Sequence, residues 1–162
     1  MTKIYLRKKI SNRVANGHPW IFANEINNAE GDVTAGSIAE VYTHDKKFLG
    51  KGYVNPQSQI QVRLLTRDKN ETIDEDFFYK GLLQAWQYRQ QLGYIENCRL
   101  IFGEADYLPQ LIIDKFNDYF VIQTLALGID VWKPALTRAL QAIFNPKGIF
   151  ERNDVPVREL EG

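Results

Sequence analysis

The hydrophobic pattern of this chain changes its period at one polar stretch, Thr66–Glu71. Before that stretch, apolar and polar residues alternate in short runs such as Gln59–Leu64, and a period of two is typical of strands with one buried face. After it, apolar residues recur at helical spacing before strand-like runs return. Several short strands within about 65 residues predict a small barrel. We therefore expect the polar stretch to link two modules.

The first module is predicted to consist of strands separated by turns. Lys3–Lys9 alternates, so that apolar residues fall on one face and basic residues on the other. The runs 37–43 and 48–54 flank a polar turn at residues 44–47, which predicts a hairpin. Two glycines in the second run would weaken a strand unless it must bend or let another backbone come close to it. We therefore expect either a bend or a close approach there.

The second module begins with a predicted helix. Thr72–Glu75 fits a capping box, and Gly93 supplies the stop. The later elements are predicted strands over 99–106, 111–114 and 119–125, a helix over 130–144 with Pro134 in its first turn, and a strand over 148–153. This order is an incomplete α+β layer, which leaves an edge or a face that needs a partner.

The predicted fold class is mixed α/β. It comprises a small barrel over residues 1–70, a linker helix over 71–97 and an incomplete α+β domain of strand, strand, helix and strand over 98–162. The chain is 44% hydrophobic and 25% charged, which is the composition of a globular protein. It contains neither an apolar run long enough for a membrane span nor the apolar stretch of a signal peptide, so we expect a cytoplasmic protein.

The residue types that carry demanding chemistry are scarce. Cys98 is the only cysteine, which rules out an intrachain disulfide and a cysteine cluster for zinc and favours an inert thiol. His18 and His44 are the only histidines, so histidine triads and multi-histidine metal sites are poorly supported. Glycine-rich phosphate loops, nucleophile elbows and zinc-protease motifs are also missing from the sequence. We therefore expect no catalytic residue and no metal site in this chain.

Basic residues concentrate near the N-terminus. Residues 1–24 contain no acidic residue, although the formal net charge of the whole chain is zero. Such an asymmetry can create one face that attracts phosphates, and a histidine beside an aromatic residue can stack on an unpaired base. Ordinary solvated charge, a core role for Trp20 and Phe22 and a turn role for His18 are the alternatives. The candidate RNA-binding residues are Arg7, Lys8, Lys9, Arg13, His18, Lys51 and Arg63.

Two groups of carboxylates are further candidates. Glu104, Asp106 and Asp114 lie on both sides of one predicted turn, which suits general acid and base chemistry or a magnesium site but also suits an ordinary turn. In Glu151–Asp154, alternation places residues 151 and 153 on one face and residues 152 and 154 on the other. Intramolecular pairing explains that segment as well as catalysis does.

Five short motifs in order resemble one bacterial family: S-adenosylmethionine-dependent methyltransferases that modify C5 of a cytosine in large-subunit ribosomal RNA. The motifs are the basic strand, Gly17-His18-Pro19-Trp20-Ile21-Phe22 with Glu25-Ile26, Gly50-Lys51-Gly52-Tyr53-Val54-Asn55-Pro56 with Ser58 and Ile60, Gly103-Glu104-Ala105-Asp106 with Leu108-Pro109, and Glu151-Arg152-Asn153-Asp154 with Val157-Arg158. Tyr107 and Gln110 depart from the pattern, because the family usually has glycines at both places.

The resemblance implies a domain order. A PUA-type RNA-binding barrel comes first, then a small α+β domain, then a Rossmann-like domain with the cofactor and a catalytic cysteine. It implies that this chain covers the first two domains and lacks the third, and Cys98 matches no catalytic motif. The chain would then hold no cofactor, although S-adenosylmethionine is expected for a full-length parent. The implied partners are large-subunit ribosomal RNA and the missing domain, whose interface would include Glu104, Asp106, Glu151, Arg152, Asn153 and Asp154.

The leading hypothesis is therefore the RNA-recognition part of a ribosomal RNA methyltransferase. A free-standing RNA-binding adaptor, whose open edge recruits a protein, is the first alternative. A carboxylate-dependent hydrolase that uses Glu104, Asp106 and Asp114 is the second. The oligomeric state is left open by the sequence.

Overall fold

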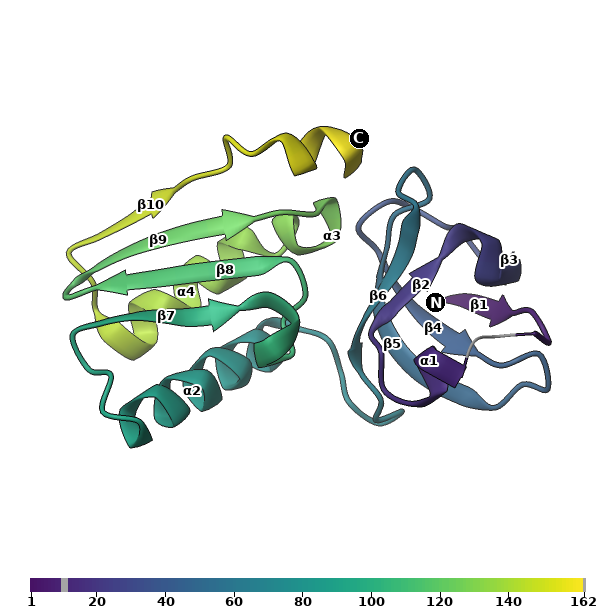
Figure 1. Cartoon of the computed structure of the whole chain (residues 1–162), viewed down its shortest axis with the longest axis horizontal. Coiled ribbons are helices and arrows are strands. Elements are labelled where there is room, and N and C mark those ends of the chain that lie inside the picture. The colour runs from purple at the N-terminus through teal and green to yellow at the C-terminus, as the bar shows by residue number, and fades with distance from the viewer. Residues whose placement is uncertain (10–11, 162) are drawn as a thin grey trace. The chain divides into compact units, whose positions relative to one another are not determined.

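The computed structural model describes residues 1–9 and 12–161, which divide into two compact units (Figure 1). Unit 1 comprises residues 1–71 and 159–162, and unit 2 comprises residues 72–158. Mixed α/β is confirmed as the fold class: a six-stranded sheet is followed by a helix and a four-stranded α+β sheet.

Unit 1 is built on the six-stranded sheet, in the order β2-β6-β5-β4-β1-β3. Only the β1–β4 pair is parallel among the described pairings of this sheet, with Tyr5 opposite Tyr42. A short helix, α1, and a 3₁₀ turn, η1, interrupt the strands. The bounds are β1 Thr2–Leu6, α1 Asn12–Ala15, β2 Trp20–Phe22, η1 Ala23–Glu25, β3 Ile26–Glu30, β4 Ile38–Tyr42, β5 Phe48–Val54 and β6 Ile60–Thr66.

Of the two explanations for the glycines of β5, a bend or a close backbone approach, the structure shows the close approach. A Cβ atom built on Gly52 would lie 2.0 Å from the carbonyl oxygen of Arg63, and one on Gly50 would lie 2.6 Å from that of Thr66. Any side chain at either position would push β5 away from β6. Both glycines therefore allow the β5–β6 pairing.

The core of unit 1 lies on one side of this sheet. The core role considered for Trp20, Ile21 and Phe22 holds for Ile21, which is fully buried, but not for Trp20 and Phe22, which are half-buried. Alternation in the short strand β2 turns only the middle residue inward. The core residues are Ile4, Leu6, Val14, Ile21, Ala39, Val41, Val54, Val62 and Leu64.

Unit 2 contains the four-stranded sheet, in the order β10-β9-β8-β7, with only β10 and β9 parallel among its described pairs. Helices α2 and α4 pack on each other and lie on one side of it (Figure 1). The bounds are α2 Glu75–Gln91, β7 Asn97–Phe102, η2 Gly103–Asp106, β8 Leu111–Phe116, β9 Tyr119–Thr124, α3 Leu127–Asp130, α4 Lys133–Phe144 and β10 Gly148–Glu151; the 3₁₀ helix η3 spans Pro156–Glu161.

The ends of the helices test the predicted caps. The residue that caps α2 is Asp74 rather than Thr72, and its carboxylate accepts a hydrogen bond of 3.0 Å from the Phe77 amide. A shift of the cap by two residues is possible because aspartate satisfies free amides as well as threonine does. Gly93 ends the helix region with φ of +82°, and Pro134 lies in the first turn of α4, both as predicted.

The two faces of the unit 2 sheet differ. The helix-covered face is buried, and Phe120 of β9 packs there against Phe144 of α4 with ring centroids 4.7 Å apart. The opposite face exposes aromatic side chains from all four strands. Among the described residues, no helix is long and apolar enough to cross a membrane.

Candidate functional site

The basic residues that follow β1 lie at the surface of unit 1. Arg7, Lys8 and Lys9 are all exposed. Arg7 Nε donates a hydrogen bond of 3.0 Å to the carbonyl oxygen of Ile26, which fixes the stem of the side chain beside β3. These three charges are therefore accessible to a polyanion.

Arg13 and His18, the next candidates, are part of a local hydrogen-bonded cluster. Arg13 Nη2 lies 3.1 and 3.0 Å from the two carboxylate oxygens of Glu25, and its Nη1 lies 2.8 Å from His18 Nδ1. Glu25 also accepts from the Phe22 amide at 2.8 Å, and His18 Nδ1 accepts from the Trp20 amide at 3.1 Å. These contacts show that the Gly-His-Pro-Trp motif holds its own loop together.

Arg63 lies inside unit 1, with only 3% of its surface exposed. Its guanidinium makes two hydrogen bonds to the carboxylate of Glu161, at 2.7 and 3.1 Å. Ser58 Oγ donates to the same carboxylate at 2.9 Å, and the Asn55 amide donates to the backbone carbonyl of Glu161 at 2.7 Å. The family motif that contains Asn55 and Ser58 therefore binds Glu161 through hydrogen bonds.

Lys51 is also buried, and its Nζ donates a hydrogen bond of 2.7 Å to the carbonyl oxygen of Glu71. Because the cations of Lys51 and Arg63 are both buried and held by protein oxygens, these two residues do not belong to the exposed basic face of unit 1. Sequence reasoning missed Glu161 as a partner because it lies 98 residues from Arg63.

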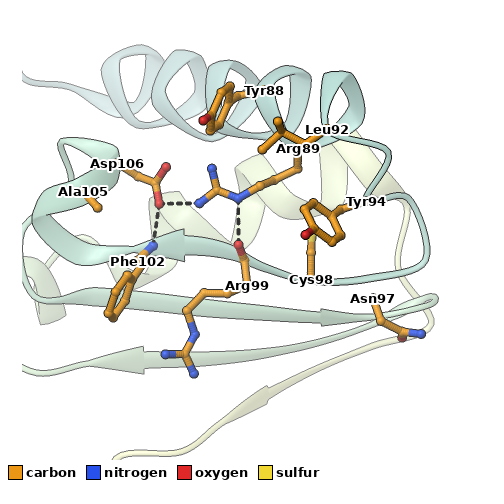
Figure 2. Close-up of a pocket in the computed structure, with 10 residues that line it drawn as sticks. All are labelled: Tyr88, Arg89, Leu92, Tyr94, Asn97, Cys98, Arg99, Phe102, Ala105 and Asp106. Atoms are coloured by element: carbon orange, nitrogen blue, oxygen red, sulfur yellow. Dashed lines mark hydrogen bonds and ion pairs between the residues drawn. The ribbon is translucent and has the colours of Figure 1, made fainter.

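The carboxylate of Asp106 in unit 2 is held in place by two donors. Its Oδ2 accepts from Arg89 Nη2 and from the Phe102 amide, each at 2.7 Å, and Arg89 Nε donates to the carbonyl oxygen of Arg99 at 2.9 Å (Figure 2). Phe102 and Arg99 belong to β7, the last strand of the sheet. The ion pair thus occupies backbone groups on the open edge of that strand.

The other two carboxylates of the hydrolase hypothesis also have protein donors. Arg99 pairs with Asp114 at 2.9 and 3.2 Å, and the Gln110 amide donates to Glu104 at 3.1 Å. Within residues 1–9 and 12–161, no group of three histidine, cysteine, aspartate or glutamate side chains is placed to hold a metal ion. This arrangement does not favour acid and base chemistry at the turn.

The segment Glu151–Asp154 forms pairs of its own, as alternation allowed. Glu151 accepts a hydrogen bond from the Asn153 amide and lies 2.6 Å from Lys133 Nζ, and Arg152 lies 3.4 Å from Asp154 on the exposed side. Asn153 Oδ1 accepts from the Thr124 amide at 3.0 Å. Residues 151 and 153 therefore anchor the segment to unit 2, while residues 152 and 154 face solvent.

Arg158 completes this anchor. Its guanidinium donates to the backbone and side-chain oxygens of Thr124 and lies 3.2 Å from Asp130. Burial opposes ionisation of Asp130, but hydrogen bonds from Thr124, Lys133 and Arg158 outweigh it and lower the pKa of this carboxyl. The ionised form of Asp130 is thus built into the folded unit.

A pocket of about 480 Å³ lies between the end of α2 and the outer edge of β7 (Figure 2). Partial burial raises the pKa of the Cys98 thiol at its wall, which favours the protonated form of the sulfur. Both arginines of the pocket have carboxylate partners, Asp106 and Asp114. The pocket is lined by Tyr88, Arg89, Leu92, Tyr94, Asn97, Cys98, Arg99, Phe102, Ala105 and Asp106.

The helix-free face of the unit 2 sheet, which we call the open face, is mainly apolar. Its aromatic side chains are between 46% and 57% exposed. The charged pair on this face, Arg99 and Asp114, is mutually neutralised, and Tyr119 lies against Phe150 with ring centroids 6.2 Å apart. Exposed aromatic clusters of this kind mark interaction surfaces. The exposed aromatic residues are Phe102, Phe116, Tyr119 and Phe150.

Comparisons with known proteins agree with this architecture. Residues 4–67 match the family model of the PUA-like domain. The chain is 41% identical over 162 residues to the ribosomal RNA large subunit methyltransferase I of Aliivibrio fischeri strain MJ11, and the match covers 98% of this chain and 41% of that relative. It is 38% identical to the protein of the same name from Cronobacter sakazakii, with coverage of 99% and 41%.

Solved structures share the fold of both units. A candidate methyltransferase complexed with SAH superimposes with a TM-score of 0.80 at 15% identity, over 94% of this chain and 40% of that one. A candidate SAM-dependent methyltransferase from Streptococcus mutans gives a TM-score of 0.79, also at 15% identity. The chain thus spans about two-fifths of the length of the relatives that it matches. It is homologous to the N-terminal two-fifths of the ribosomal RNA large subunit methyltransferase I family, and residues 4–67 within it form a PUA-like domain.

Proposed function

We propose that this chain is the RNA-recognition part of an S-adenosylmethionine-dependent ribosomal RNA methyltransferase. Unit 1 binds large-subunit ribosomal RNA. Methyl transfer to a base, for which the family resemblance suggests C5 of a cytosine, takes place in a further domain of the kind that the longer relatives have room for. The cofactor S-adenosylmethionine belongs to that further domain and not to this chain.

The observation that carries the proposal is the exposed basic segment Arg7–Lys9 within a PUA-like domain. Accessible cations next to one another neutralise successive phosphates and release counterions, which produces affinity that falls with salt. Arg13 and His18 support the same face indirectly, because their cluster with Glu25 shapes the neighbouring loop. Base selectivity would then come from an unpaired RNA segment rather than from a duplex groove.

We also propose that the open face of unit 2 packs against the further methyltransferase domain. Acidic residues outnumber basic residues over residues 72–158, which disfavours contact with a phosphate backbone. The charged pair on the open face, Arg99 and Asp114, is mutually neutralised. The open face therefore suits an apolar protein surface better than RNA. This proposal moves the interface away from Glu104, Asp106, Glu151 and Asn153, whose polar groups have internal partners. Arg152 and Asp154 remain candidates for its rim.

Binding to protein-free large-subunit ribosomal RNA across a salt series tests the RNA proposal. The test variant is Arg7→Gln/Lys8→Gln/Lys9→Gln, which removes charge from exposed positions and leaves the Arg13–Glu25 pair intact. We expect tight binding by the unmodified chain. For the variant, the slope of log affinity against log salt should become less negative by about 2. Binding that does not respond to salt, or an unchanged slope in the variant, would contradict the proposal.

Addition of the remaining three-fifths of the Aliivibrio fischeri relative, as a separate polypeptide, tests the docking proposal. We expect the open face to become protected from hydrogen exchange around Phe116 and Tyr119. The variant Phe116→Asp/Phe150→Asp should abolish that protection, whereas Tyr88→Asp, an exposed aromatic on α2, should not. Protection that persists in the open-face variant would place the contact elsewhere.

A further inference from the structure

The turn between β4 and β5, which closes a hairpin, carries two lysines. Residues 44–47 are all exposed, and this turn includes Lys46 and Lys47. The ammonium side chain of Lys47 is 80% exposed although it lies 3.1 Å from Asp45. The turn therefore presents basic groups to solvent at its tip.

The register of the sheet brings this tip to the same end of unit 1 as Arg7–Lys9. Strands β1 and β4 are parallel neighbours, and Tyr5 lies opposite Tyr42. The basic segment follows directly after the end of β1, and the turn follows directly after the end of β4 (Figure 1). Two basic segments about 40 residues apart in the sequence thus leave one end of the sheet side by side, which follows from parallel pairing.

Hydrogen bonds within the turn close its backbone. Thr43 and Lys47 are joined by a backbone hydrogen bond of 2.8 Å, and the Lys47 amide donates to Thr43 Oγ1 at 2.9 Å. A hydrogen bond from the Thr43 hydroxyl and the nearby Lys47 ammonium lower the pKa of Asp45 to about 2. The ionised Asp45 is thereby committed to the internal geometry of the turn.

Aromatic packing fixes the root of the turn to β1. The rings of Tyr5 and Tyr42 stack with centroids 5.6 Å apart, and Phe48 packs edge-on against Tyr42 at 5.7 Å. Both basic segments therefore extend from one packed aromatic cluster at the end of two neighbouring strands. Cations that a folded scaffold places side by side can engage successive phosphates of one strand.

We infer that the β4–β5 turn is a second phosphate-contacting element, which binds the same RNA strand as Arg7–Lys9 through Lys46 and Lys47. The ligand class is the phosphate backbone of single-stranded or remodelled RNA, because lysine at a turn tip reads charge rather than base edges. This inference rests on the proposed function of unit 1 and extends its RNA-binding face beyond the residues predicted from sequence.

The test compares Lys46→Gln/Lys47→Gln with the control Lys80→Gln/Lys147→Gln, measured by binding to protein-free large-subunit ribosomal RNA across a salt series. The control also removes two exposed lysines, each paired with an aspartate, but from unit 2. Glutamine has a Cβ atom as lysine does, so the backbone strain from the positive φ at position 46 is the same in the unmodified chain and in the turn variant. We expect the turn variant to bind RNA about tenfold more weakly at low salt. Its slope of log affinity against log salt should be less negative by about 1 to 2.

The outcomes separate this inference from the proposal on which it rests. Salt-sensitive binding by the unmodified chain, combined with equal affinities for the turn and control variants, would overturn the inference and leave the proposed function intact. A lack of binding by the unmodified chain would overturn both. Thermal unfolding of both variants by circular dichroism should match that of the unmodified chain, which confirms that a loss of binding reports lost contacts.

Discussion

Arg63 and Glu161 form a buried ion pair with two hydrogen bonds in unit 1 although they are 98 residues apart in the chain. Removal of one member of a buried pair leaves the other charge without compensation, which costs about 3 kcal/mol. We therefore predict that Glu161→Ala accelerates hydrogen exchange of β6 amides by roughly a hundredfold. Glu159→Ala removes an exposed carboxylate two residues away and should leave exchange unchanged. Equal exchange in both variants would contradict a structural role for the pair.

The pair of Arg89 and Asp106 should protect the open edge of unit 2. Arg89→Met keeps the apolar stem but removes the donors to Asp106 and to the carbonyl oxygen of Arg99. We expect a loss of about 2 kcal/mol in stability, because a part-buried carboxylate and a strand carbonyl lose their partners. Because an exposed strand edge promotes pairing between chains, we also expect this variant to self-associate. Urea unfolding would measure the loss of stability, and sedimentation velocity would measure the association.

Arg138→Met is the matched control for that prediction. Arg138 also pairs with a carboxylate, that of Glu75, but both side chains are more than half exposed. Exposed pairs contribute about 0–1 kcal/mol, so this variant should keep the stability and the sedimentation coefficient of the unmodified chain. If Arg138→Met destabilised unit 2 as much as Arg89→Met, loss of any helix arginine would have the same effect. That result would contradict a special role of Arg89 at the open edge of β7.

The anchor around Asp130 should make the stability of unit 2 depend on pH. The pKa of Asp130 is lowered in the folded state, so the ionised carboxylate stabilises the fold at pH values above the pKa that Asp130 has in the unfolded chain. This contribution is lost as pH falls through the pKa that Asp130 has in the folded state. We predict that Asp130→Asn is less stable than the unmodified chain at pH 6. The difference should shrink below about pH 4, near the ordinary pKa of aspartate.

Urea unfolding from pH 6 to pH 3, followed by tryptophan fluorescence, checks this dependence. Asp154→Asn is a suitable control, since the Asp154 side chain is 75% exposed and its ion-pair contact with Arg152 is 3.4 Å long. We expect no pH-dependent difference for it. A constant gap between the Asp130 variant and the unmodified chain at all pH values would assign the role of Asp130 to packing rather than to charge.

Local sequence signals predicted the elements of this fold well. Alternation found β6, and Gly93 and Pro134 marked helix ends. The two β5 glycines signalled a bend or a close backbone approach, of which the structure shows the approach. These signals succeed because they depend on the period of side chains and on allowed backbone angles, which a short window contains.

Long-range partners could not be predicted from the same windows. The parallel pairing of β1 with β4 places Arg7–Lys9 beside the β4–β5 turn, and no spacing rule reveals that register. In the same way, Arg63 of β6 and Lys51 of β5 looked like surface cations, whereas Arg63 is buried against Glu161 and Lys51 against the Glu71 carbonyl. An alternating strand shows which side chains share a face but not whether another segment covers it.

Tyr107 lies in the left-handed region, with φ of +60°, where the family pattern has glycine. This backbone conformation costs a residue with a Cβ atom about 1–2 kcal/mol, and glycine avoids that cost although it gains entropy in the unfolded chain. The ring of Tyr107 is mostly exposed, so little packing is lost on its removal. We therefore predict that Tyr107→Gly stabilises unit 2 by about 0.5 kcal/mol.

Tyr107→Ala separates the backbone effect from the loss of the ring, because alanine keeps the Cβ atom and hence the strain. Urea unfolding should show a higher midpoint for the glycine variant and no increase for the alanine variant. Gln110, with φ of +62°, offers an internal comparison: Gln110→Gly relieves the same strain but loses a hydrogen bond of 3.1 Å to Glu104, so its gain should be smaller. If alanine and glycine at position 107 gave the same midpoint, the backbone of this turn would not be strained, and the departure from glycine would carry no cost.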